Sequence, residues 1–146
     1  MNGLSGSEYD GEQMTVSRGR VLVIDDNPQL LRLVSVFLNM EGYEVFTTGD
    51  AEAGIRVADS ASPDLVVLDL LMPGVDGYEV CRRLKAQCPR LAVVAVTDAG
   101  CDDGGNAARH AGANHVLSKP YRLAYLERVI NGLARTSLRE TASRVS

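Results

Sequence analysis

The sequence lacks the features that mark membrane or exported proteins. No apolar run approaches the roughly 18 to 20 residues that a helix needs to cross a bilayer, and no hydrophobic signal region stands near the N-terminus. The three cysteines, Cys81, Cys88 and Cys101, cannot all pair, and their scattered spacing is not that of a metal-binding knuckle. We therefore expect a protein of the reducing cytoplasm that does not enter the membrane.

The chain also lacks a basic stripe. It has fifteen basic and nineteen acidic residues, for a formal net charge of −4, and the basic ones are dispersed. Because phosphate neutralisation supplies most of the affinity for nucleic acids, we expect no direct nucleic-acid contact by this chain. Its 146 residues, 45% hydrophobic and 23% charged, are typical of a single soluble globular domain.

One stretch in the middle of the chain organises the rest. Three apolar residues, Val66 to Leu68, precede Asp69, and a loop containing Pro73-Gly74 and Asp76-Gly77 follows. This pattern predicts a buried strand that ends in one carboxylate. Desolvating a charge without a partner is costly, so Asp69 needs a cation, a donor or water beside it. The simpler alternative is that Asp69 caps the loop; Asp76 is most simply a turn residue.

Three further strand-like runs also end in polar side chains. They are Arg20–Ile24 before Asp25-Asp26, Leu91–Val96 before Thr97, and His115–Ser118 before Lys119-Pro120. The carboxyl ends of the strands form the ligand crevice of an open parallel sheet, so these side chains would share one pocket with Asp69. Simpler alternatives are helix capping for Asp25 and Asp26, strand filling for Thr97 and a surface position for Lys119.

Taken in this order, the motifs resemble the receiver domain of two-component response regulators. The resemblance covers Gly19 to Arg135 and also includes Met72-Pro73-Gly74. It implies that Asp69 accepts a phosphoryl group from a phosphohistidine on a histidine kinase or a phosphotransfer protein. It further implies signalling through contact with an unknown downstream protein, without enzymatic activity beyond the chain's own phosphorylation and dephosphorylation.

Helical patterns follow each strand, which predicts a parallel sheet covered on both faces. The expected fold is a flavodoxin-like (βα)5 doubly wound sheet with strand order 2-1-3-4-5. Residues 1–18 would form a disordered arm, 19–136 the receiver domain and 137–146 a flexible tail, with the last helix over Tyr121–Arg135. In the first helix, the spacing predicts a buried face of Leu30, Leu33, Val34, Phe37 and Leu38. Leu31 and Val36 are either scattered surface residues or a docking face for a partner helix.

Clustered carboxylates repel one another unless a cation enters, and Mg²⁺ is a suitable hard ion. We expect Asp26 to bind it directly and Asp25 partly through water, with Asp69 as both ligand and nucleophile. The family pattern adds the backbone carbonyl of Leu71. Lys119 would neutralise the transferring group and Thr97 would donate its hydroxyl to a phosphoryl oxygen. In the family, the Lys119-Pro120 bond is cis.

Two positions depart from the family pattern. Asp98 replaces a small residue after Thr97, so we expect slower phosphorylation than in an Asp98→Ala variant. Val116 replaces an aromatic residue whose ring reports phosphorylation. Because Gly and Asp are frequent after strand four, we also predict a weak fourth helix and a mobile segment from Asp98 to Asn106.

These departures leave a second functional hypothesis, a pseudo-receiver that acts as a constitutive protein-interaction module. The three clustered acids argue against it. An aspartate-nucleophile phosphatase would carry a second Asp two residues after the nucleophile, where this chain has Leu71. No output domain follows Arg135, so we expect a stand-alone receiver that is a monomer or a weak dimer.

Overall fold

The computed structural model describes residues 17–98, 103 and 105–145. In these ranges strands and helices alternate as predicted. The elements are β1 (Arg20–Ile24), α2 (Pro28–Met40), β2 (Glu44–Thr48), α3 (Ala51–Ala61), β3 (Leu65–Asp69), α4 (Gly77–Gln87), β4 (Ala92–Asp98), α5 (Asn106–His110), β5 (His115–Lys119) and α6 (Leu123–Val145). The predicted disordered arm lies outside the described residues except at its last two positions. No helix in the described ranges is both long and apolar enough to cross a membrane.

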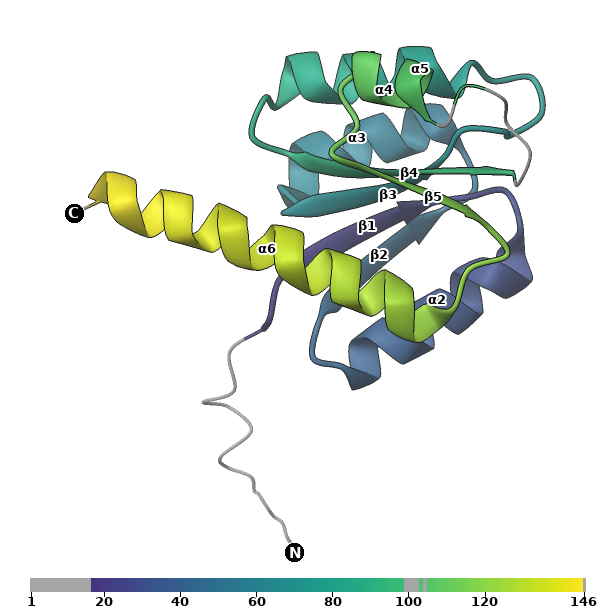
Figure 1. Ribbon diagram of the computed structural model, residues 1–146. Helices are drawn as coiled ribbons and strands as arrows, with labels where there is room; N and C mark the ends of the chain where they lie inside the picture. Colours follow the sequence, from purple (N-terminus) through teal and green to yellow (C-terminus); the bar gives the residue numbers. More distant parts are fainter. Residues whose placement is uncertain (1–16, 99–102, 104, 146) are drawn as a thin grey trace, which may run out of the picture.

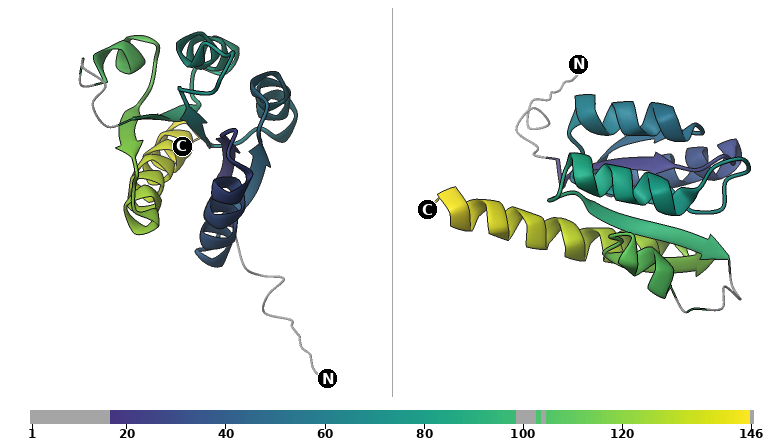
Figure 2. Two further views of the ribbon diagram at one scale, coloured as in Figure 1. Left: turned by 90° about the vertical axis from the view of Figure 1, so that its right-hand side faces the viewer. Right: turned by 90° about the horizontal axis from the view of Figure 1, so that it is seen from above.

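The five strands form one parallel sheet in the order β2-β1-β3-β4-β5, which confirms the predicted flavodoxin-like topology. Helices α2 and α6 cover one face of this sheet, and α3, α4 and α5 cover the other (Figures 1 and 2). Since all strands run the same way, their carboxyl ends lie at a single edge. Strands β1 and β3 are neighbours, so the residues that follow them lie side by side.

The core consists of two layers of apolar side chains, one on each face of the sheet. Alternate residues of β1 point to opposite faces: Val21 and Val23 pack under α2 and α6, and Leu22 and Ile24 pack under α3 and α4. Strand β3 is buried at every position. Its continuous apolar sequence follows from this double coverage, because no face of a central parallel strand contacts water.

Helix α2 begins as the sequence predicts, but its buried face is narrower. The side chain of Asn27 accepts hydrogen bonds from the backbone N–H groups of Gln29 and Leu30 at 3.0 and 3.2 Å, and Pro28 is the first helical residue. Val34 and Leu38 are fully buried, whereas Leu33 is 54% exposed, so its predicted inward position is wrong. The flank carrying Leu31 packs against the core instead.

Helix α5 is shorter, and helix α6 longer, than the other described helices. Helix α5 has only five residues and starts after Gly105, whose φ of 87° is left-handed; this confirms the prediction of a weak helix. Most of the predicted mobile segment, Asp98 to Asn106, lies outside the described residues. Helix α6 continues to Val145 and extends past the sheet (Figure 1). The predicted end at Arg135 was therefore wrong, and the flexibility of 137–146 stays a prediction.

Candidate functional site

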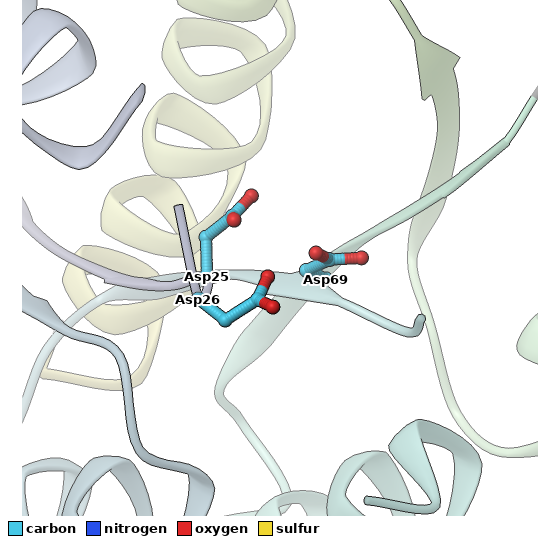
Figure 3. Close-up of side chains that lie close together, drawn as sticks. All are labelled: Asp25, Asp26 and Asp69. Carbon is cyan, nitrogen blue, oxygen red and sulfur yellow. The ribbon is translucent and has the colours of Figure 1, made fainter. Parts of the chain in front are cut away.

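Three carboxylates lie together at the carboxyl edge of the sheet (Figure 3). Asp25 and Asp26 follow β1, and Asp69 is the last residue of the neighbouring strand β3. A carboxylate oxygen from each lies within 4.8 Å of the others. Asp25 and Asp69 are each only 4% exposed, while Asp26 is exposed to solvent. The predicted clustering of these residues is thus present in the structure.

The two buried carboxylates are held by the same local arrangement. Oδ1 of Asp25 accepts a hydrogen bond from the backbone N–H of Asn27 at 2.9 Å, and Oδ1 of Asp69 accepts one from the N–H of Leu71 at 2.9 Å. Such bonds to the residue two positions later are typical of Asp in turns. They fix the orientation of both side chains and leave Oδ2 of each directed to the shared site.

Lys119 provides the positive charge at this site. Its Nζ lies 3.0 Å from Oδ2 of Asp25 and 3.2 Å from Oδ2 of Asp69. Burial lowers the pKa of Lys119, but its hydrogen bond to Asp25 and the charges of Asp25 and Asp69 outweigh this, so its pKa lies above the ordinary value. The ammonium is therefore charged at neutral pH. The Lys119-Pro120 peptide bond is cis, as the resemblance implied.

The residues fit a divalent cation. Oxygen ligands suit Mg²⁺, which is usually held by one or two carboxylates and otherwise by water and substrate oxygens. Asp25, Asp26 and Asp69 each supply one carboxylate oxygen, and these three oxygens lie within 4.8 Å of one another. One ammonium faces these three negative charges, so the described cluster retains an excess of negative charge that a cation would reduce. The predicted contribution of the Leu71 carbonyl stays a prediction.

Thr97 does not point its hydroxyl at this cluster. The residue is 4% exposed and lies near the end of β4, but its Oγ1 donates to the backbone carbonyl of Asp98 at 2.9 Å. Its cross-strand partner is Ser118, not Lys119. Asp76, which we predicted to be a turn residue, accepts hydrogen bonds from the backbone N–H groups of Tyr78 and Glu79 and caps α4.

Sequence reasoning missed a pocket beside the carboxylates. Its volume is about 460 Å³, and its lining comes from the loop after β1, the end of β4 and the segment after β5: Asn27, Leu30, Asp98, Lys119, Pro120 and Tyr121. Burial, followed by the charge of Asp25, raises the pKa of Tyr121 to about 12. The available signal was an aromatic residue directly after Lys119-Pro120. Lys119 belongs both to this pocket and to the carboxylate cluster.

Comparison with known proteins extends these observations. The model of the response regulator receiver domain matches residues 21–131. The transcriptional regulatory protein TcrA of Mycobacterium tuberculosis is 36% identical over 120 residues, which are 82% of this chain and 47% of that protein. The chain therefore spans about half the length of the curated relatives that it matches.

Solved structures show the same fold. The receiver domain of NtrX from Brucella abortus is 30% identical, with a TM-score of 0.74, over 80% of this chain and 98% of that chain. A CheY-like receiver domain protein from Methanospirillum hungatei is 24% identical, with a TM-score of 0.78, and so shows the fold alone; it covers 83% of this chain and 97% of that chain. With a family model matching most of its length and a fold to suit, the chain belongs to the response regulator receiver domain family.

Proposed function

We propose that this chain is a phosphoacceptor receiver of a two-component phosphorelay, with Asp69 as the residue that receives the phosphoryl group. The observation that carries the proposal is the contact of Lys119 with Asp69 at 3.2 Å inside a cluster of three carboxylates. A purely structural loop cap would not require two further acids beside it. The proposal includes a cytoplasmic location and no reaction beyond the chain's own phosphorylation and dephosphorylation.

In the proposed mechanism an oxygen of Asp69 attacks phosphorus and the bond from phosphorus to the donor breaks, so that an acyl phosphate forms. The Leu71 N–H holds Oδ1 of Asp69, which restricts rotation of the carboxylate. Lys119 contributes positive charge beside Oδ2. Mg²⁺, held by Asp25, Asp26 and Asp69 with the Leu71 carbonyl, would neutralise charge on the phosphoryl oxygens. Thr97 would reach a phosphoryl oxygen only after its hydroxyl leaves the Asp98 carbonyl.

The proposed donor is a histidine kinase or a histidine phosphotransfer protein. Helix α2 offers it an apolar contact surface, because Leu33, Val36 and Met40 are 54%, 52% and 79% exposed and follow one another at helical spacing. The downstream target is a further protein. Relatives that are named as transcriptional regulators extend beyond the matched region, and contact with nucleic acid through this chain itself is not part of the proposal.

The test is intact-mass spectrometry after incubation with Mg²⁺ and either acetyl phosphate or N-phosphoimidazole. We expect one added phosphate on the native chain and none on Asp69→Asn. Tandem mass spectrometry after borohydride reduction should locate the modification at Asp69. A folded, Mg²⁺-binding chain that gains no phosphate from either donor would overturn the proposal and favour the constitutive interaction module.

A further inference from the structure

The pocket beside the carboxylates has one feature that the transfer mechanism leaves unused, the side chain of Asp98. Asp98 is the last residue of β4 and pairs across the sheet with Lys119, the last residue of β5. Paired residues of neighbouring parallel strands project to the same face of the sheet. Both side chains line the pocket of about 460 Å³. Asp98 therefore stands next to the lysine that contacts Asp69.

The charge of Asp98 is not balanced within the described part of the chain. Lys119 is paired with Asp25 and Asp69, and no ion pair there includes Asp98. Lys119 is thus already paired with two carboxylates, and Asp98 adds a further negative charge to the pocket that both residues line. Asp98 is exposed, so its charge acts on whatever enters the pocket from solvent.

The other walls of the pocket suit a flat, positively charged ring. Leu30 and Pro120 provide apolar surface, and Tyr121 provides a half-buried aromatic ring. An aromatic face attracts a cation, and a carboxylate accepts a hydrogen bond from a ring N–H. An imidazole protonated on the nitrogen away from phosphorus has this shape, this charge and this donor.

We infer that Asp98 is a donor-specificity residue, which favours phosphoryl donors with a protonated imidazole leaving group and opposes donors with an anionic leaving group. The inference rests on the proposed phosphorylation of Asp69 and deepens it. In the favoured reaction an Asp69 oxygen bonds to phosphorus while the P–N bond breaks, and the electron pair of that bond stays on nitrogen. Because the ring enters protonated on its other nitrogen, it leaves as neutral imidazole and needs no further proton.

An acyl phosphate behaves differently in the same pocket. The P–O bond breaks, and the leaving carboxylate carries away a full negative charge. Asp98 repels this growing charge, whereas it attracts the imidazolium of the other donor. A unit charge a few ångströms away in partly hydrated surroundings changes such rates by about tenfold. Slow phosphorylation caused by Asp98 would therefore be specific to anionic leaving groups.

The experiment measures the phosphorylation rates of the full chain with N-phosphoimidazole and with acetyl phosphate, at equal Mg²⁺, pH and ionic strength. The variants are Asp98→Asn and Asp98→Ala. The matched control is Asp59→Asn, which removes the same charge from an exposed position of α3. We expect the ratio of the imidazole rate to the acetyl rate to fall about tenfold in both Asp98 variants and to stay unchanged in Asp59→Asn.

The outcomes separate this inference from the proposal on which it rests. A rate ratio that stays unchanged in the Asp98 variants, whether both rates change equally or neither changes, would overturn the specificity role while Asp69 still becomes phosphorylated. A fall of the same size in Asp59→Asn would also overturn it, because net charge alone would then explain the effect. No phosphate on any chain with either donor would instead reject the phosphoacceptor function.

Discussion

The ammonium of Lys119 lies slightly closer to Asp25 than to Asp69, with Nζ 3.0 Å from one carboxylate and 3.2 Å from the other. Lys119 is the last residue of β5, so its ammonium links this strand to the ends of β1 and β3 at the carboxyl edge of the sheet. Both carboxylates are buried, so each depends on this cation when no metal is bound. The lysine and a divalent cation would neutralise the same two carboxylates.

The first prediction concerns the loss of this cation. Lys119→Met should lower the free energy of unfolding in metal-free buffer by about 1–3 kcal/mol, because two buried carboxylates lose a charged partner. Added Mg²⁺ should recover most of this loss. Lys85→Met is the control, since Lys85 donates to the Leu91 carbonyl away from the cluster. Any loss of stability in this variant should be the same with and without Mg²⁺. Urea unfolding with and without Mg²⁺ gives the comparison.

The raised pKa of Lys119 gives this contribution a pH dependence. A group with a higher pKa in the folded state stabilises fully below its unfolded pKa and loses this effect as the pH rises through the folded value. The stability difference between the native chain and Lys119→Met should thus be constant from pH 7 to 9. It should decrease above the ordinary lysine value of 10.5. A difference that already declines below pH 9 would contradict this.

A second prediction distinguishes the exposed acid from the buried ones. Asp26→Asn should slightly stabilise the metal-free chain, because it removes repulsion without breaking any pair recorded for Asp26 in the described structure. It should also reduce the shift in melting temperature that Mg²⁺ produces, since a ligand that binds the folded state more weakly stabilises it less. Asp59→Asn serves as the control for charge. An unchanged Mg²⁺ response in Asp26→Asn would remove this residue from the metal site.

Much of this fold and site can be predicted from the sequence because it depends on local sequence patterns. Apolar runs that end in Asp25, Asp69 and Lys119 predict parallel strands, and parallel strands place their ends at one edge. The cluster of carboxylates then follows without any long-range information. Asn27-Pro28 similarly marks the start of α2 through capping chemistry alone.

The errors arise where tertiary packing decides. Leu33 fits the spacing of the apolar residues of α2, yet the side of the helix that carries Val34 and Leu38 is the buried one. Periodicity alone does not fix how a helix is rotated about its axis relative to the sheet. The polar residues after Arg135 read as a tail, but helix α6 needs no apolar face once it extends past the sheet. The side-chain conformation that directs the Thr97 hydroxyl to the Asp98 carbonyl likewise cannot be predicted from the sequence.

A third prediction concerns the glycine that opens α4. A Cβ on Gly77 would lie 2.5 Å from the Cα and the carbonyl oxygen of Leu70, the residue after Asp69. Backbone atoms cannot rotate away, so Gly77→Ala should cost about 1–3 kcal/mol of stability and displace the neighbouring Asp69, the proposed phosphoacceptor. Gly132→Ala is the matched control: an added Cβ there meets nothing within 4 Å, and the change should stabilise α6 by about 0.5–1 kcal/mol. Unfolding curves and phosphorylation rates of the two variants test this contrast.

The last prediction concerns Val116, which stands where the family has an aromatic ring. Atoms of its side chain would lie 3.0 to 3.2 Å from a Cβ on Gly105, so Val116 packs closely against the backbone at the start of α5. A ring on this side would overlap that backbone. Val116→Phe should therefore lower the free energy of unfolding by about 1–3 kcal/mol and speed amide exchange across Asn106–His110. Val116→Ile, which adds one methyl group, should change both much less. Unaltered exchange in Val116→Phe would show that the ring fits beside Gly105, and that this receiver retains space for the ring movement that its sequence lacks.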